Sequence, residues 1–146
     1  MDFISVFLQK ISDAQLWTKN IHLDRNEYLT VKGKTDTNLY YIVNGSLKIY
    51  FEDEYEEQII RLGYTNNFIA ALDSYISEQP TSLYLQALKK CELKVLPKTI
   101  FLQFLEKDAD LARMWQQLQG QLIYQQIERE IDILTYSPMQ LSLIHI

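Results

Sequence analysis

The strongest constraint on the fold is a run of strand-forming residues, NLYYIVNGSLKIYFEDE, at positions 38–54. Two stretches rich in Tyr, Ile, Val and Leu flank Asn44-Gly45. Asn-Gly is the preferred pair for a two-residue type I′ turn, because both of its residues need a positive φ. The run therefore predicts a β-hairpin that turns at Asn44-Gly45.

Further short runs of strand formers lie on both sides of this hairpin. IHLDRNEYLTVKG at 21–33 alternates weakly, EEQIIRLGY follows at 56–64, and TSLYLQALKKCELKVLP at 81–97 holds two more strands. Short strands at close spacing, with turns between them, are typical of antiparallel barrels and rolls. We predict a mainly β fold with flanking helices, an antiparallel β-roll of the jelly-roll type.

Helical periodicity is found only towards the two ends of the chain. Residues 3–16 predict a short amphipathic helix, and Pro97 is well placed to precede another. Residues 108–136 then predict one helix of about 28 residues, or ~42 Å. A compact domain of this size has a radius of gyration of only ~14 Å, so this helix would extend beyond it.

Two adjoining apolar stripes run along the long predicted helix. Their width favours two contacts, one with the β-roll and one with the same helix of a second chain. The alternative is a single long core helix with a frayed end. On the first interpretation, the interface of a homodimer consists of Trp115, Leu118, Leu122, Ile123 and Ile127.

Composition restricts the class of protein. With 146 residues, 47% apolar and 23% charged, the chain is expected to be one soluble globular domain. A net charge of -5 argues against a nucleic-acid-binding surface on this domain. There is no signal peptide pattern and no apolar run near the ~20 residues of a membrane span, so we expect a cytoplasmic protein without membrane contact.

The stretch NNFIAALDSYISEQPTSLYLQAL at 66–88 has the form of a loop that wraps a phosphate, yet it contains no Lys and no Arg. A short apolar run leads into a helical turn, then a proline, then a strand. Together with the preceding strands, this stretch resembles the phosphate-binding cassette of Crp/Fnr-type transcription regulators. The resemblance covers residues 3–136 and implies a cyclic-nucleotide-binding-like β-roll with a short N-terminal helix and a long C-terminal dimerisation helix.

The resemblance also implies which residues would contact a nucleotide. Phe68 matches the Phe that begins the family's cassette, and Asn66 stands where a Gly is usual, which suits a left-handed turn. Ala71, however, takes the position of the Glu that holds the ribose, and Thr81 that of the Arg that pairs with the phosphate. We therefore predict a degenerate pocket with low affinity for cyclic nucleotides, formed by Phe68, Ile69, Ala70, Ala71, Leu72, Thr81, Ser82 and Leu83.

Other chemistry finds little support in the residues. A metal-binding cupin needs a cluster of His and Glu, and His22 is the only histidine before the C-terminal segment. Ser82 has no histidine to activate it, so we expect no enzymatic activity. Cys91 is expected to be an inert thiol, and the acidic run at 52–58 a solvated hairpin end. We predict no cofactor and no metal.

The last residues, LSLIHI at 141–146, match no element of the resembling family. They can be written in codons as CTG TCT CTT ATA CAC ATC, which resembles the end of a transposon used to fragment DNA for sequencing. We interpret them as translated adaptor. The alternative is a genuine short protein with an apolar tail.

These observations predict four segments. They are a β-roll at 1–107, a dimerisation helix at 108–136, a hinge at 137–140 towards an absent winged helix-turn-helix domain, and the adaptor at 141–146. The predicted function is the sensory half of a Crp/Fnr-like regulator that contacts DNA only through the absent domain. The alternative is a stand-alone module that acts through protein contacts.

Overall fold

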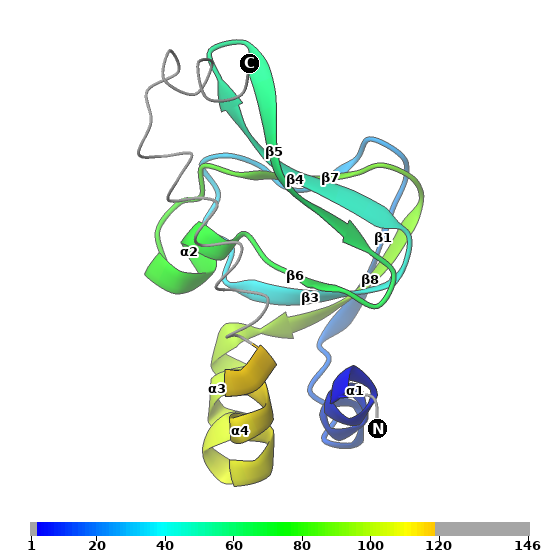
Figure 1. Cartoon of the computed structure of the whole chain (residues 1–146), viewed down its shortest axis with the longest axis vertical. Helices are drawn as coiled ribbons and strands as arrows, with labels where there is room; N and C mark the ends of the chain where they lie inside the picture. Colours follow the sequence, from blue (N-terminus) through cyan, green and yellow to red (C-terminus); the bar gives the residue numbers. More distant parts are fainter. Residues whose placement is uncertain (1–2, 119–146) are drawn as a thin grey trace.

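The computed structural model describes residues 3–118 of the chain. Two four-stranded sheets pack face to face, with α1, α3 and α4 together at one end and α2 at the side (Figure 1). The helices are α1 (Phe3–Asp13), α2 (Leu72–Ser77), α3 (Lys98–Lys107) and α4 (Ala109–Leu118). The strands are β1 (Lys19–Leu23), β2 (Tyr28–Thr30), β3 (Asn38–Asn44), β4 (Ser46–Asp53), β5 (Glu56–Tyr64), β6 (Phe68–Ile69), β7 (Tyr84–Ala87) and β8 (Cys91–Pro97).

Both sheets are antiparallel throughout, which confirms the predicted β-roll. One sheet has the order β1-β8-β3-β6 and the other the order β2-β7-β4-β5. Strands that are far apart in sequence therefore pair, as β1 does with β8. The segment after β6, which contains α2, lies at the side of the roll (Figure 1).

The predicted hairpin at Asn44-Gly45 is wrong. The two flanking strands do not pair with each other: β3 pairs with β8 and β6, while β4 pairs with β5 and β7. Gly45 alone has a positive φ, of 118°, and a Cβ there would lie 2.6 Å from Cys91 Sγ. The turn carries the chain from one sheet to the other, and glycine is required because the backbone passes so close to β8.

The true hairpin connects β4 and β5. Its register pairs Asp53 with Glu56, so Glu54 and Tyr55 form the two-residue connection. Glu54 has the left-handed conformation there, with φ 58°, and Tyr55 is fully exposed. The prediction of a solvated acidic hairpin end is confirmed.

Two separate apolar clusters stabilise the structure. The first fills the space between the sheets, and the second lies between β3, β6, β8 and the four helices. β3 contributes to both, because its alternate side chains point to opposite faces. The second cluster consists of Phe7, Ile11, Leu39, Tyr41, Phe68, Ala70, Tyr75, Leu96, Phe101, Leu111 and Trp115.

The C-terminal helices begin as predicted. Pro97 precedes α3, and Asp108 separates α3 from α4 in an extended conformation. The Asp108 carboxylate accepts a hydrogen bond from the Leu111 N–H at 3.0 Å and pairs with Lys10 at 3.3 Å. The N–H bond, followed by Lys10, lowers the pKa of this carboxyl group.

The long helix predicted at 108–136 is described from Ala109 to Leu118. The rest of it, the hinge at 137–140 and the segment 141–146 lie outside the described residues. No helix within residues 3–118 is long and apolar enough to cross a membrane.

Candidate functional site: the cassette at 66–83

The candidate site is the segment that begins with a tight turn, forms β6 and α2, and returns to β7. Asn66 has φ 72°, so the predicted left-handed turn residue is confirmed. Its side-chain oxygen accepts a hydrogen bond from the Tyr41 hydroxyl at 2.5 Å. β6 then pairs with β3 through Tyr40 and Tyr41, which fixes the start of α2 against the roll.

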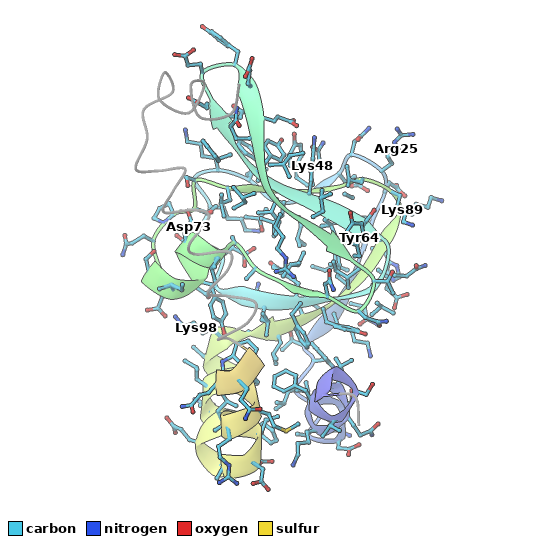
Figure 2. All side chains as sticks on the ribbon, viewed as in Figure 1. Arg25, Lys48, Tyr64, Asp73, Lys89 and Lys98 are labelled. Carbon is cyan, nitrogen blue, oxygen red and sulfur yellow. The ribbon has the colours of Figure 1, made fainter. Side chains whose placement is uncertain are left out.

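Asp73 lies in the first turn of α2 (Figure 2), and its carboxylate accepts four hydrogen bonds within the cassette. One oxygen accepts hydrogen bonds from the Ser74 N–H at 2.8 Å and from the Thr81 hydroxyl at 2.5 Å. The other accepts them from the Ser82 N–H at 2.8 Å and the Ser82 hydroxyl at 3.0 Å. The donors of the segment that follows Pro80 are therefore directed at an anion supplied by the chain itself.

The backbone of Thr81 is held rigidly. Its N–H donates to Lys34 O and its carbonyl accepts from the Gly33 N–H, both at 2.9 Å. Its hydroxyl oxygen also accepts a bond from the Leu83 N–H at 3.0 Å. Thr81 is buried, whereas Ser82 is exposed, so the cassette opens to solvent on the Ser82 side.

A buried polar cluster anchors α2 to the rest of the roll. The Asp36 carboxylate accepts hydrogen bonds from the Tyr40 hydroxyl at 2.6 Å, from the Thr30 hydroxyl, and from the Asn38 N–H at 3.0 Å. The Asp36 N–H donates to Ser74 Oγ at 2.8 Å, which connects the cluster to the cassette helix. Burial, and then the charge of Asp36, raises the pKa of Tyr40, so this phenol stays a donor.

The C-terminal end of α2 is held by Lys98 at the start of α3. The ammonium donates to Tyr75 O at 2.6 Å and lies 3.8 Å from a carboxylate oxygen of Glu78. A cation at this end of a helix compensates the unpaired carbonyls. The Lys98 ammonium is therefore bound at the C-terminal end of α2. The sequence analysis did not predict this contact.

Tyr75 provides a test of this packing. Its hydroxyl is buried without a hydrogen-bond partner among residues 3–118, and burial raises its pKa to about 12 from an ordinary value of ~10. The folded state holds the Tyr75 proton more tightly than the unfolded chain does. The contribution of this group to the free energy of unfolding is therefore fully present below pH ~10 and is lost as the pH rises towards ~12. The variant Tyr75→Phe should be at least as stable as the wild type at pH 7 and lose ~2 kcal/mol less stability across that range.

Urea unfolding at a series of pH values measures this difference. Tyr55→Phe is the matched control, because Tyr55 is fully exposed and should leave the pH dependence unchanged. Parallel alkaline curves for the wild type and Tyr75→Phe would contradict the prediction.

The structure places the eight predicted pocket residues on different sides of β6. Ile69, Ala71 and Leu83 pack in the cluster between the sheets, while Phe68 and Ala70 pack in the second cluster. Leu72 and Thr81 are buried, and Ser82 alone of the eight is exposed. Of the eight, Ile69, Ala71 and Leu83 therefore face the interior between the sheets, and Phe68 and Ala70 face away from it.

The predicted dimer residues are placed only in part. Trp115 stacks on Phe7 with ring centroids 5.6 Å apart and meets Phe101 edge-on at 4.8 Å, and it is 5% exposed within its own chain. It has little surface left for a partner. Leu118 is the last described residue of α4, and Leu122, Ile123 and Ile127 lie outside the described residues.

The structure also places His22 and Cys91. His22 is exposed on β1. Cys91 is buried, and burial raises the pKa of its thiol, which favours the inert form.

Comparison with known proteins agrees with the fold. The family model of the cyclic nucleotide-binding domain matches residues 20–108, more than half of the chain. The chain therefore belongs to the cyclic nucleotide-binding domain family. No curated protein matches it in sequence.

Solved structures of bacterial regulators share this fold. The catabolite activator protein of Thermus thermophilus has a TM-score of 0.68 at 16% identity, over 87% of this chain and 59% of that one. A transcriptional regulator of Thermotoga maritima has a TM-score of 0.68 at 20% identity, over 93% and 100%. The sensor domain of the transcriptional regulator DNR from Pseudomonas aeruginosa has a TM-score of 0.65 at 20% identity, over 88% and 95%.

These likenesses confirm the predicted resemblance to Crp/Fnr-type regulators at the level of fold. The chain spans about 59% of the length of the Thermus thermophilus protein.

Proposed function

We propose that the chain is the sensory and regulatory domain of a Crp/Fnr-like transcription regulator and that its cassette binds cyclic nucleotides weakly or not at all. The domain has no enzymatic role. It forms a homodimer through the helix that begins near residue 108, and any DNA contact belongs to a separate domain of the regulator. The β-roll and the likeness to regulators support the regulatory part of this proposal.

One observation carries the weak-binding part: the donors at Thr81 and Ser82 are directed at Asp73, in a stretch from residue 62 to 88 without Lys or Arg. A phosphate taken out of water needs charge compensation. Thr81 supplies a hydroxyl where the resembling family has Arg, and Ala71 supplies no acceptor for a ribose. Ala71 is fully buried in the cluster between the sheets, so its position adds no polar contact.

Calorimetric titration of the full chain with cyclic AMP and cyclic GMP tests this function. A charge-assisted hydrogen bond contributes about 1.5–3 kcal/mol, and a bidentate Arg supplies more than one. Losing the Arg and the Glu should weaken a micromolar site by roughly two to four orders of magnitude, at ~1.4 kcal/mol per tenfold. Binding of either nucleotide tighter than about 10 μM would contradict the proposal.

The genomic sequence after codon 140 separates the regulator from the stand-alone module. A helix-turn-helix in the same reading frame supports the regulator. A stop codon there supports a module that acts through protein contacts.

A further inference from the structure

The Asp73 carboxylate has the hydrogen-bond environment of a bound oxyanion. A carboxylate offers about four acceptor positions. Each Asp73 oxygen accepts two of the four bonds described above, at 2.8 and 2.5 Å on one oxygen and at 2.8 and 3.0 Å on the other. All four donors are neutral, two backbone N–H groups and two hydroxyls. The donor set is therefore saturated by the chain's own anion.

This arrangement is more than a local helix cap. Only the Ser74 N–H belongs to α2, while the other three donors come from residues eight and nine positions further along the chain. Thr81 Oγ accepts from the Leu83 N–H, so its own hydrogen is oriented towards Asp73. Asp73 thus joins the two sides of the cassette, as a ligand between them would.

An external anion would have to use the same donors. The Ser82 N–H and hydroxyl are at the solvent-exposed side of the cassette, where a phosphate can approach. While Asp73 occupies them, an incoming phosphate meets both a donor set already in use and a like charge next to it, which disfavours binding.

We propose that Asp73 is a specificity-determining residue that occupies the anion site of the cassette from within and so excludes phosphate-bearing ligands. This inference rests on the proposed function, in which the cassette does not bind a cyclic nucleotide, and it adds a second reason for that weak binding. The loss of Arg and Glu weakens the site, whereas Asp73 closes it. With Asp73 in place, the cassette admits an uncharged ligand or none. Without Asp73, it regains a neutral donor set for a small oxyanion.

The test uses the full chain labelled with ¹⁵N and titrated with inorganic phosphate at constant ionic strength. The Ser82 amide resonance is the main readout, because this N–H donates directly to Asp73. In the wild type we expect no saturable shift of this resonance. In Asp73→Ala we expect a saturable shift, with an affinity for phosphate at least about tenfold higher than in the wild type, the effect of one regained charge-assisted hydrogen bond.

Two further variants separate a specific effect of the Asp73 carboxylate from a general effect of charge. Asp73→Asn keeps the shape and one acceptor oxygen but removes the charge, and we expect an intermediate gain. Glu78→Gln removes one charge from the exposed carboxyl group just after α2, which contacts Lys98 but none of the four donors, and it should respond like the wild type. An equal gain in Glu78→Gln would show a general charge effect and overturn the proposal.

Amide hydrogen exchange of the unaltered chain gives an independent result that does not depend on the folding of any variant. The exposed Ser82 amide should be protected from exchange, because its hydrogen is held by Asp73. An unprotected Ser82 amide, or a phosphate response in the wild type, overturns the proposal. Folded Asp73→Ala and Asp73→Asn proteins without a phosphate response do so as well.

The failure of this inference is distinct from the failure of the proposed function. If the wild type binds cyclic AMP tightly in the calorimeter, the function is wrong. If the wild type does not bind cyclic AMP and the Asp73 variants do not bind phosphate, the function stands and Asp73 is only a structural ligand of the loop.

Discussion

Replacement of Trp115 by alanine should lower the free energy of unfolding by about 3–5 kcal/mol, the usual cost of removing a buried Trp side chain. The indole fills the space between Phe7 on α1 and Phe101 on α3, with ring centroids 5.6 Å and 4.8 Å away. Its removal leaves a cavity at the point where these three helices meet, and the second cluster loses its largest ring.

The dependence of this loss on protein concentration identifies its origin. Because the ring is buried within its own chain, the loss measured by urea unfolding should be the same over a wide range of protein concentrations. A loss that disappears at high concentration would instead place Trp115 in an interface between chains. Leu102→Ala is the control, since Leu102 is 43% exposed on the outside of α3 and should cost less than ~1 kcal/mol.

Replacement of Asp36 by alanine should lower the free energy of unfolding by about 3–5 kcal/mol, because each buried donor left without an acceptor costs ~1–3 kcal/mol. The hydroxyls of Thr30 and Tyr40 and the N–H of Asn38 would all lose their acceptor. Thr30, Asp36 and Tyr40 are each 2% exposed, so water cannot easily replace the carboxylate.

Two variants make the Asp36 measurement specific. Asp36→Asn keeps an acceptor oxygen in place and should cost less than the alanine variant, as measured by thermal or urea unfolding. Asp24→Ala removes an exposed carboxylate and should change the stability by no more than ~0.5 kcal/mol. If Asp36→Ala were as mild as Asp24→Ala, the cluster would not anchor α2.

Local pattern was sufficient to predict most of the strands, the N-terminal helix and the start of α3, whereas the left-handed residue at Asn66 was predicted from the resemblance to the family. The strands and helices depend on residues close together in the sequence. The hairpin at Asn44-Gly45 was predicted wrongly because the dipeptide specifies a turn but not which strands pair on either side of it. The close approach of Gly45 to Cys91 involves a residue 46 positions away, and no local pattern contains it.

The candidate site was predictable in outline and not in its chemistry. The missing Arg and Glu could be seen at Thr81 and Ala71 by alignment with the resembling family. The bonds from Thr81 and Ser82 to Asp73 depend on how the chain turns back at Pro80, after α2, and brings these two residues to Asp73. The only sequence signal was an acid in a loop without cations, eight residues before a Thr-Ser pair. For Trp115, an apolar stripe indicates burial but does not say whether the partner is the same chain or another.

Because its side chains alternate, β3 separates the interior of the roll from the second cluster by the thickness of one strand. Tyr40 and Ile42 face the interior of the roll, whereas Leu39 and Tyr41 face the second cluster with Trp115. β6, which pairs with β3, repeats the pattern with Ile69 on one side and Phe68 on the other, and the Phe68 ring lies 5.5 Å from that of Phe7. A displacement of β6 therefore moves the surface on which α1 and α4 rest. Trp115 is thus a built-in optical reporter of the cassette, and its emission should follow any ligand that shifts β6.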